Sequence, residues 1–163
     1  MIELRKIDHD NFEGVLALKL PKEQQKFVAP NIYSLAEAYK DLTNNEKPPM
    51  PFAIYHGEEL IGFTMMEFCE LEEGDHFFDD FGDKNIYNFF RFMIDESHQG
   101  KGYGRQAMVK IMEFLKTQPQ GKADSISVCY EPTNEVSRKL YTSLGFVETG
   151  HIDDGEVIAR FVL

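Results

Sequence analysis

The chain has 163 residues, 42% of them hydrophobic and 14 of them phenylalanine, which is enough for one domain spanning 1–163 and leaves little room for two. The formal net charge of −11 argues against nucleic acid as a partner, because nucleic acids are bound by basic faces. This charge suits a cationic partner, although an acidic balance is equally ordinary for a soluble enzyme. No apolar run of about 18 residues and no signal peptide is evident, so we expect no membrane span and a cytoplasmic location.

The residue types that bind metals are few or scattered. Cys69 and Cys129 are the only cysteines, too few for a disulfide framework or a cysteine-based zinc site, and we expect both to be buried free thiols. The spacing of Asp79, Asp80 and Asp83 does not match a calcium loop. The five histidines have no ligand spacing: His9, His56, His76, His98 and His151. The sequence therefore predicts no metal site.

The N-terminal half shows the hydrophobic patterns of strands and helices. Ser34 followed by Glu37 has the spacing of a capping box, which predicts that a helix begins there and continues through Leu42. The acidic segment 69–84 is expected to be irregular. The other expected elements are a strand at 1–7, a helix at 11–18, and a β-hairpin at 52–68 that turns at His56-Gly57-Glu58.

The C-terminal half alternates between strand and helix patterns. Its clearest element is a helix from about Gly102 or Tyr103 to Lys116, whose single apolar face is formed by Ala107, Met108, Ile111, Met112 and Leu115. A second helix is expected at 134–143, followed by Gly145 in a left-handed conformation. Strands are expected at 86–95, 124–130, 146–149 and 157–163. Strands followed by alternating helices and strands predict an α+β fold with a mixed sheet.

The segment QGKGYG, residues 99–104, lies between a predicted strand and a predicted helix. Its glycines allow the backbone to approach a ligand closely, and the N–H groups at the start of a helix attract anions, so we expect phosphate or pyrophosphate here. The spacing excludes a P-loop, because no Ser or Thr follows Lys101. It also excludes a dinucleotide fingerprint, because Arg105 stands where the third glycine is required. A tight turn without a ligand is the alternative.

Two separated motifs carry a resemblance to a known family. Gln99-x-x-Gly102-x-Gly104 resembles the Arg/Gln-x-x-Gly-x-Gly/Ala pyrophosphate loop of the GCN5-related N-acetyltransferases (GNATs), and NEVSRKLYTSLGFVETG, residues 134–150, resembles their C-terminal signature. The resemblance covers roughly 52–163. It implies the GNAT fold, a mixed and mostly antiparallel sheet with a splayed strand pair and helices on both faces. It also implies acetyl-CoA (coenzyme A) as co-substrate, no metal, and by analogy a possible homodimer.

The resemblance also implies site residues. Tyr141 matches the tyrosine that protonates the leaving thiolate. The residues that match the pantetheine-binding strand, the pyrophosphate loop and the C-terminal cofactor contacts are Phe92, Met93, Ile94, Gln99, Gly100, Lys101, Gly102, Tyr103, Gly104, Arg105, Asn134 and Ser137. On helical periodicity, Tyr141 lies about 100° from the apolar stripe 136–140–144 and can point to the side of the core. An aromatic residue at the core's edge is the alternative.

Acetyl transfer to an amine sets further chemical demands. The tetrahedral oxyanion needs a hydrogen-bond donor, which a backbone N–H of the splayed strand can supply. Proton donation from a tyrosine, with a pKa of about 10, to a thiolate, with a conjugate pKa of about 8.5, is slightly uphill but feasible. An alkylammonium group is neutral in only about one molecule in 2,500 at pH 7. A base, a water relay or a desolvating pocket must therefore supply the free amine.

The acceptor implied by the nearest resemblance is a polyamine, because NFFRFMIDESHQGKGYG, residues 88–104, looks like the strand and loop of bacterial spermine/spermidine acetyltransferases. The acidic stretch 70–83 suits the distal ammonium groups of such a substrate, and a solvated loop is the alternative. The residues expected to bind the amine are Glu67, Glu72, Glu73 and Asp75. Another amine (an amino acid, an aminoglycoside or a protein N-terminus) and a non-catalytic acyl-CoA-binding module are alternatives; Tyr141 disfavours the last.

The sequence departs from some polyamine acetyltransferases on the splayed strand. Those proteins carry acidic residues where this chain has Phe90 and Arg91. We expect Arg91 on the face opposite Phe90 and Phe92, paired with a carboxylate elsewhere. Tyr33 and Tyr39 are further candidates to line the acceptor groove.

Overall fold

The computed structural model describes residues 1–44 and 47–163. Within these residues a seven-stranded sheet has the order β1-β2-β3-β4-β5-β7-β6, in which β4 and β5 are parallel and all other neighbours are antiparallel. The strands are β1 (Ile2–Lys6), β2 (Met50–His56), β3 (Glu59–Glu70), β4 (Asn85–Ile94), β5 (Ser125–Tyr130), β6 (Val147–Asp153) and β7 (Glu156–Val162).

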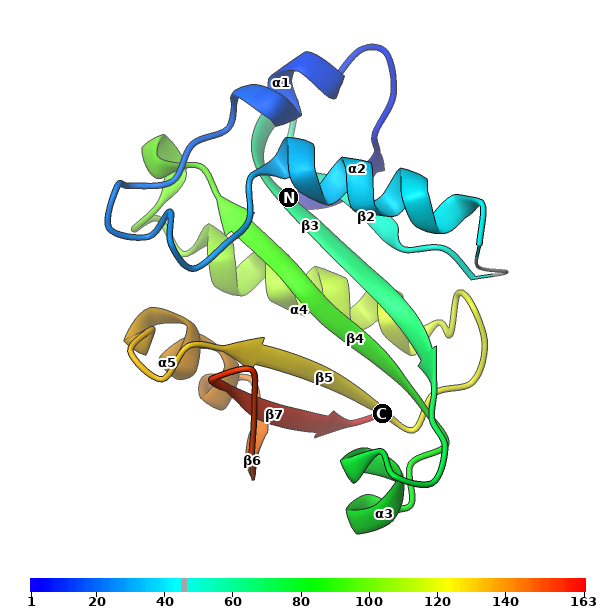
Figure 1. The fold of residues 1–163 in the computed structure, drawn as a ribbon. Coiled ribbons are helices and arrows are strands. Elements are labelled where there is room, and N and C mark those ends of the chain that lie inside the picture. The colour runs from blue at the N-terminus through cyan, green and yellow to red at the C-terminus, as the bar shows by residue number, and fades with distance from the viewer. Residues whose placement is uncertain (45–46) are drawn as a thin grey trace.

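Helices cover both faces of the sheet (Figure 1). One face packs against α1 (Phe12–Ala17), α2 (Asn31–Leu42) and α3 (His76–Phe81), and the other against α4 (Tyr103–Lys116) and α5 (Glu135–Ser143). A short 3-10 helix, η1 (Glu96–His98), links β4 to the glycine loop. The predicted α+β fold, with a mixed and mostly antiparallel sheet between helices, is confirmed.

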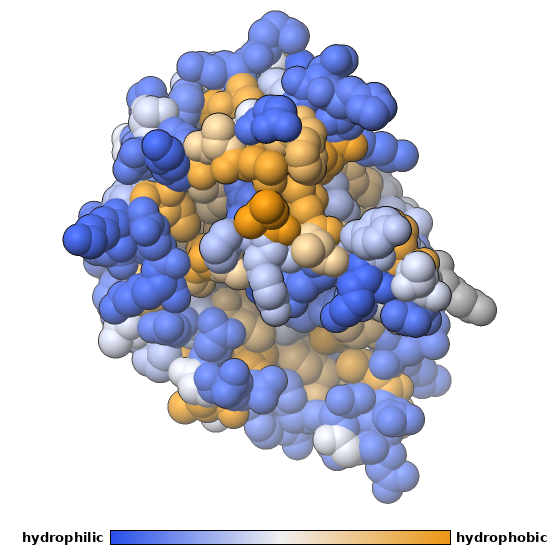
Figure 2. All heavy atoms as spheres, turned by 45° about the horizontal axis from the view of Figure 1, so that its top comes forward, coloured by the Kyte–Doolittle hydropathy of each residue, from blue (hydrophilic) through white to orange (hydrophobic). Residues whose placement is uncertain are grey.

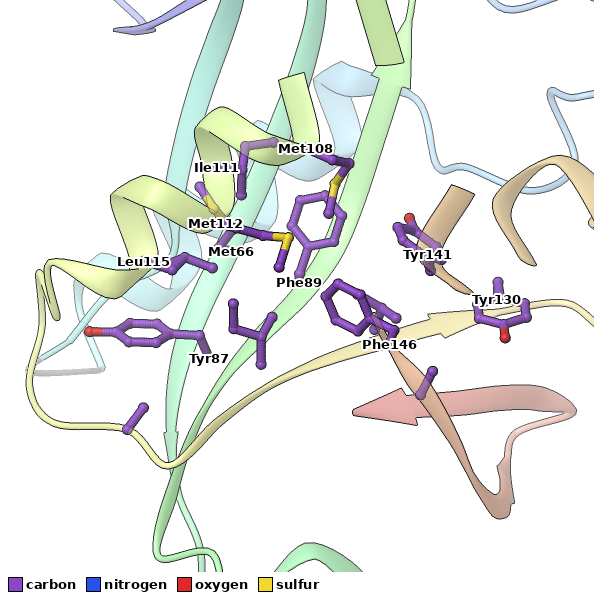
Figure 3. Packing of buried hydrophobic residues seen from close by; sticks show 14 of the residues in the cluster. Met66, Tyr87, Phe89, Met108, Ile111, Met112, Leu115, Tyr130, Tyr141 and Phe146 are labelled. Carbon is purple, nitrogen blue, oxygen red and sulfur yellow. The ribbon is translucent and has the colours of Figure 1, made fainter. Parts of the chain in front are cut away.

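The largest core cluster lies between the sheet and α4 (Figure 3). The buried residues of α4 are Ala107, Met108, Ile111, Met112 and Leu115, which is the predicted apolar face. They pack against strand residues such as Met66, Tyr87 and Phe89. Full burial of each large apolar side chain contributes about 1.5–3 kcal/mol, so this cluster fixes α4 and the loop that precedes it.

The strands β4 and β5 separate after Phe89. Their parallel pairing joins Ile86–Phe89 to Ser125–Val128, and β4 then continues to Ile94 paired only with β3. A bulge accompanies the separation, because Met65 pairs with Arg91 and Met66 with Phe89, which leaves Phe90 as the extra residue. The predicted splayed pair is therefore present, and the free edge of β4 runs toward the glycine loop (Figure 1).

The predicted capping box at Ser34 and Glu37 is wrong, because α2 begins at Asn31 with Pro30 as its N-cap residue. A buried contact holds this earlier start: Asn31 Nδ2 donates to the carbonyl oxygen of Val15 over 2.9 Å. The hydroxyl of Ser34 lies one turn into the helix and donates to the Pro30 carbonyl oxygen over 3.4 Å. Tertiary contact, rather than the local capping pattern, determines where α2 begins.

The segment 69–84 is not irregular throughout, as expected, because β3 runs to Glu70 and α3 follows. Phe77 of α3 is buried against Ile86 and Ile158, and Gly82 ends the helix at φ +73°. The strand β6 also extends beyond the predicted 149 to Asp153, where it forms a hairpin with β7. Acidic residues on the outer side of α3 concealed the apolar spacing that buries it.

The two cysteines are free thiols, but both are half-buried rather than fully buried. Burial raises the pKa of the Cys69 thiol to about 12 and that of Cys129 to about 11, so both are protonated at neutral pH. In the part of the chain that the structure describes, no group of three or more candidate metal ligands comes together. None of the described helices combines the length and apolar character needed to cross a membrane.

Candidate active site

A groove of about 280 Å³ lies between the end of β4, the glycine loop and the start of α5. Of the predicted cofactor residues, those that line it are Phe92, Met93, Ile94, Gln99, Gly100, Gly102, Tyr103, Gly104, Arg105, Asn134 and Ser137. Lys101 does not line the groove and is exposed. The fold thus brings three separate parts of the sequence to one groove.

The glycine loop presents its backbone to this groove. Gly100 and Gly102 adopt φ +74° and +78°, and Gly102 is the N-cap residue of α4. Among the described residues, no group accepts a hydrogen bond from a backbone N–H of residues 100–105. A Cβ added at Gly100 or Gly102 would meet no atom within 4 Å and would project into open space. Free N–H groups at a helix start form a site for an anion such as pyrophosphate.

Gln99 holds the glycine loop in place. Its amide nitrogen donates to the Ile94 carbonyl oxygen and to Gln24 Oε1, both over 2.9 Å. Gln24 Nε2 donates back to Gln99 Oε1 over 3.1 Å. The side chain of Gln99 therefore joins β4, the glycine loop and the α1–α2 connection, which is a positioning role. Arg105 similarly anchors α4 to α5, since its Nη1 donates to Ser143 Oγ over 2.6 Å.

One wall of the groove was not predicted from the sequence. This wall comes from the α1–α2 connection and from α5, and its residues are Leu20, Gln24, Phe27, Val28, Val136 and Leu140. Figure 2 shows hydrophobic side chains gathered on the face that carries α1 and α2. The available signal was the pair Phe27-Val28 within the otherwise polar run PKEQQKFVAP, residues 21–30.

A second cavity, of about 40 Å³, occupies the gap between β4 and β5. It shares a wall with the groove, and the shared residues are Phe27, Val28, Phe92, Asn134 and Ser137. The other residues that line it are Phe89, Phe90, Arg91, Cys129, Tyr130 and Tyr141. Asn134 caps α5, because its Oδ1 accepts a hydrogen bond from the Ser137 N–H over 3.1 Å. The groove and the strand gap therefore adjoin, and Tyr141 stands in the gap.

Tyr141 belongs to the main core cluster and is only 6% exposed. The expectation that it points to the side of the core is wrong, because Val136 of the predicted apolar stripe is 71% exposed and the buried face of α5 is centred on Tyr141. Figure 3 shows its ring beside Phe146, with Phe89 and Tyr130 also within aromatic contact.

The hydroxyl of Tyr141 is protonated and has no hydrogen-bond partner among the described residues. The fully buried side-chain atoms without a hydrogen-bond partner do not include this hydroxyl oxygen. Part of the oxygen therefore remains accessible. Burial, with smaller contributions from Cys129, Tyr130 and Glu156, raises the pKa of Tyr141 and keeps it protonated. The neighbouring Tyr130 hydroxyl differs, because it donates to Glu148 Oε1 over 2.8 Å.

Arg91 pairs with a carboxylate, as predicted. Its Nη2 lies 2.8 Å from Glu37 Oε2, and its Nε donates to Ser34 Oγ over 3.1 Å. The predicted alternation is wrong for Phe90, because the bulge places Phe90 and Arg91 on the same face, with the guanidinium 4.9 Å from the ring centroid of Phe90. Phe92 packs toward the opposite face, near α4.

The structure does not bring the predicted amine-binding residues to the gap. Glu67 lies on β3, where its Oε1 accepts a hydrogen bond from Asn88 Nδ2 over 2.9 Å. Glu72, Glu73 and Asp75 lie between β3 and α3, near the Asn85 end of β4, whereas the groove lies at its Ile94 end, roughly 30 Å along the strand. None of the four lines either cavity. Tyr33 and Tyr39 are exposed and line neither cavity.

The acetyltransferase (GNAT) family model matches residues 12–146, and the chain belongs to this family. It is 26% identical over 165 residues to the spermine/spermidine N(1)-acetyltransferase of Bacillus subtilis, and the match covers 96% of this chain and 95% of that protein. Over a shorter stretch of 62 residues, the chain is 39% identical to the alpha/beta-tubulin-N-acetyltransferase 9 of Drosophila melanogaster. That match covers 37% of this chain and only 31% of the Drosophila protein.

Solved structures share the fold over nearly the whole chain. The aminoglycoside acetyltransferase AAC(6')-Ib, in complex with coenzyme A and kanamycin, superposes with a TM-score of 0.74 at 19% identity, covering 99% of this chain and 95% of that one. The spermidine N-acetyltransferase of Vibrio cholerae, in complex with CoA and spermine, superposes with a TM-score of 0.68 at 18% identity, covering 99% and 94%. The protein is therefore a GNAT acetyltransferase in family and fold.

Proposed function

We propose that this protein transfers the acetyl group of acetyl-CoA to a primary amine of a polyamine of the spermine/spermidine class. The single observation that carries the transfer chemistry is the continuity of the site. A loop of unpaired N–H groups leads along the free edge of β4 to a gap that is lined by Tyr141. The groove residues fit acetyl-CoA, which supplies the activated acetyl thioester when bound.

The chain's residues have distinct roles in this proposal. The N–H groups of residues 100–105 hold the pyrophosphate, and the free edge of β4 at Phe92–Ile94 pairs with the pantetheine arm. An N–H of the same edge stabilises the oxyanion as the amine attacks. Tyr141, which is protonated at neutral pH, donates its proton to the departing thiolate. The single domain, the dimer and the cytoplasmic location remain predictions.

The polyamine assignment is supported by two observations. The full-length resemblance to the Bacillus spermine/spermidine acetyltransferase covers 96% of this chain, and the net charge of −11 suits a polycation. An aminoglycoside is also a polycation, so charge does not separate the two substrates. The experiment must therefore compare acceptors directly.

The test is the release of free thiol from acetyl-CoA with a panel of amines. The panel holds spermidine, spermine, putrescine, lysine, kanamycin and a peptide with a free N-terminus, and acetyl-CoA binding is measured separately by calorimetry. We expect rapid release with spermidine or spermine. Release with kanamycin or the peptide alone would replace the polyamine by that acceptor. Binding of acetyl-CoA without release on any amine would contradict the enzyme assignment.

A further inference from the structure

Glu156, the first residue of β7, lies on the side of the sheet that carries α3, one strand beyond β5 and the gap between β4 and β5. Side chains alternate along β7, and Ile158 packs with Cys129 and Phe77 on this side, whereas Val157 packs with the Tyr141 cluster on the other. Glu156 therefore shares the face of Ile158. Cys129 pairs with Ile158 and lines the gap, so Glu156 lies roughly 7 Å farther along the sheet.

The carboxylate of Glu156 is within electrostatic range of both walls of the gap. Its charge contributes to the raised pKa values of Cys129 and Tyr141 on the β5 side. Arg91, on β4, in turn favours the charged form of Glu156.

Glu156 has no partner in the described part of the chain, whereas two other carboxylates on elements near the gap do. Glu37 pairs with Arg91, and Glu148 pairs with Arg138. Among the described residues, none forms a hydrogen bond or ion pair with the Glu156 side chain, although it is half-buried. Burial raises its pKa above the ordinary value of 4.5, and the charges of Glu131, Asp153 and Asp154 add to this effect against the opposing charge of Arg91. This half-buried carboxylate is therefore available to bind a cation.

We propose that Glu156 binds the ammonium group of the acceptor and takes its proton, so that the neutral amine enters the gap between β4 and β5. This inference rests on the proposed function. In the step, an N–H proton of the ammonium passes to the carboxylate, the nitrogen lone pair attacks the thioester carbonyl carbon, and the C–S bond breaks. The thiolate takes the proton of Tyr141, and the second proton lost by the nitrogen restores Tyr141. The proton on Glu156 leaves to solvent.

The test compares Glu156→Gln with Glu113→Gln. The first change keeps the shape and removes the charge, whereas the second removes an exposed α4 carboxylate that pairs with Lys110. For Glu156→Gln we expect kcat/KM for the amine to fall about 100-fold, with an unchanged Kd for acetyl-CoA. In the wild type, kcat/KM should fall as the pH is lowered and Glu156 takes up a proton, and the midpoint of this fall should lie above pH 4.5. The fall in kcat/KM should be absent from Glu156→Gln. Glu113→Gln should behave as wild type.

A stability measurement separates catalysis from a structural role. The folded-state pKa of Glu156 is raised, so its ionisation above pH 4.5 disfavours the folded state, and Glu156→Gln should unfold at a slightly higher temperature than wild type at pH 7. An active wild type whose Glu156→Gln variant keeps kcat/KM within twofold would overturn the role of Glu156 alone. A wild type that binds acetyl-CoA but acetylates no amine would overturn the proposed function, and this role with it.

Discussion

The two sides of the gap between β4 and β5 are built differently. On the acetyl-CoA side, the continuous segment 99–105 supplies backbone N–H groups, so the site depends on loop conformation more than on side-chain identity. On the acceptor side, Arg91, Cys129 and Glu156 come from three different strands. Their identities can change without altering the fold, so the difference explains how one fold keeps a common donor site while its acceptor varies.

Tyr141→Phe should give the largest effect, because Tyr141 stands where the two sides meet. We expect kcat to fall by about 10²–10⁴, since the leaving thiolate loses its proton donor, while the Kd for acetyl-CoA changes little. The matched control is Tyr130→Phe, which removes a hydroxyl from the adjacent ring but one that is already bonded to Glu148. Equal losses of turnover in both variants would contradict the assignment of Tyr141.

Gly102→Ala tests whether the acetyl-CoA side depends on backbone conformation. Gly102 adopts φ +78°, where an alanine is strained by about 1–2 kcal/mol, and its Cβ would project into the space in front of the loop. We expect the Kd for acetyl-CoA to rise about tenfold, measured by calorimetry. Gly82→Ala is the control, with φ +73° and open space at the C-terminal end of α3. The control variant should lose a similar amount of stability but keep the wild-type Kd for acetyl-CoA. An unchanged Kd for acetyl-CoA in both variants would contradict the role of the glycine loop in binding acetyl-CoA.

The acetyl-CoA side could be predicted largely from the sequence because its signals are local. Three residue spacings, at 99–104, 107–115 and 134–146, indicated the loop and its two helices, and the structure contains all three, although α5 buries Tyr141 and exposes Val136. Lys101 is the exception among the predicted cofactor residues, since it is exposed and does not line the groove. The positions of glycines and of apolar residues on one helix face need no knowledge of distant contacts.

The acceptor side could not be predicted because tertiary contacts assemble it. The bulge at Phe90 reverses a simple strand alternation, and neither it nor the Asn31–Val15 contact that starts α2 has a local signal. The acidic segment that looked like a substrate-binding loop contains α3, held by the burial of Phe77. Glu156 follows a turn between β6 and β7 and gains its setting only because β7 lies next to β5.

His76 should give the smallest effect, and it tests how firmly the acceptor side is held. Its ring on α3 stacks on His151 of β6 with centroids 4.5 Å apart, and its Nε2 is buried without a hydrogen-bond partner. Burial lowers the pKa of His76, and the neighbouring His151 adds to this effect against the opposing charges of Asp80, Asp153 and Asp75. Neutral His76 therefore favours docking of α3 against the β6–β7 hairpin.

The lowered pKa sets the direction of the pH dependence. As the pH falls below 6.5, the unfolded chain takes up the His76 proton more readily than the folded chain, so the folded state loses stability. His76→Leu should remove this part of the loss, reducing the fall in Tm between pH 7.5 and 5.5 by no more than about 2–4 °C. The exposed His9→Gln is the control and should keep the wild-type dependence. If His76→Leu also kept it, the α3–β6 contact would not respond to pH, and the acceptor side would be as firmly held as the glycine loop.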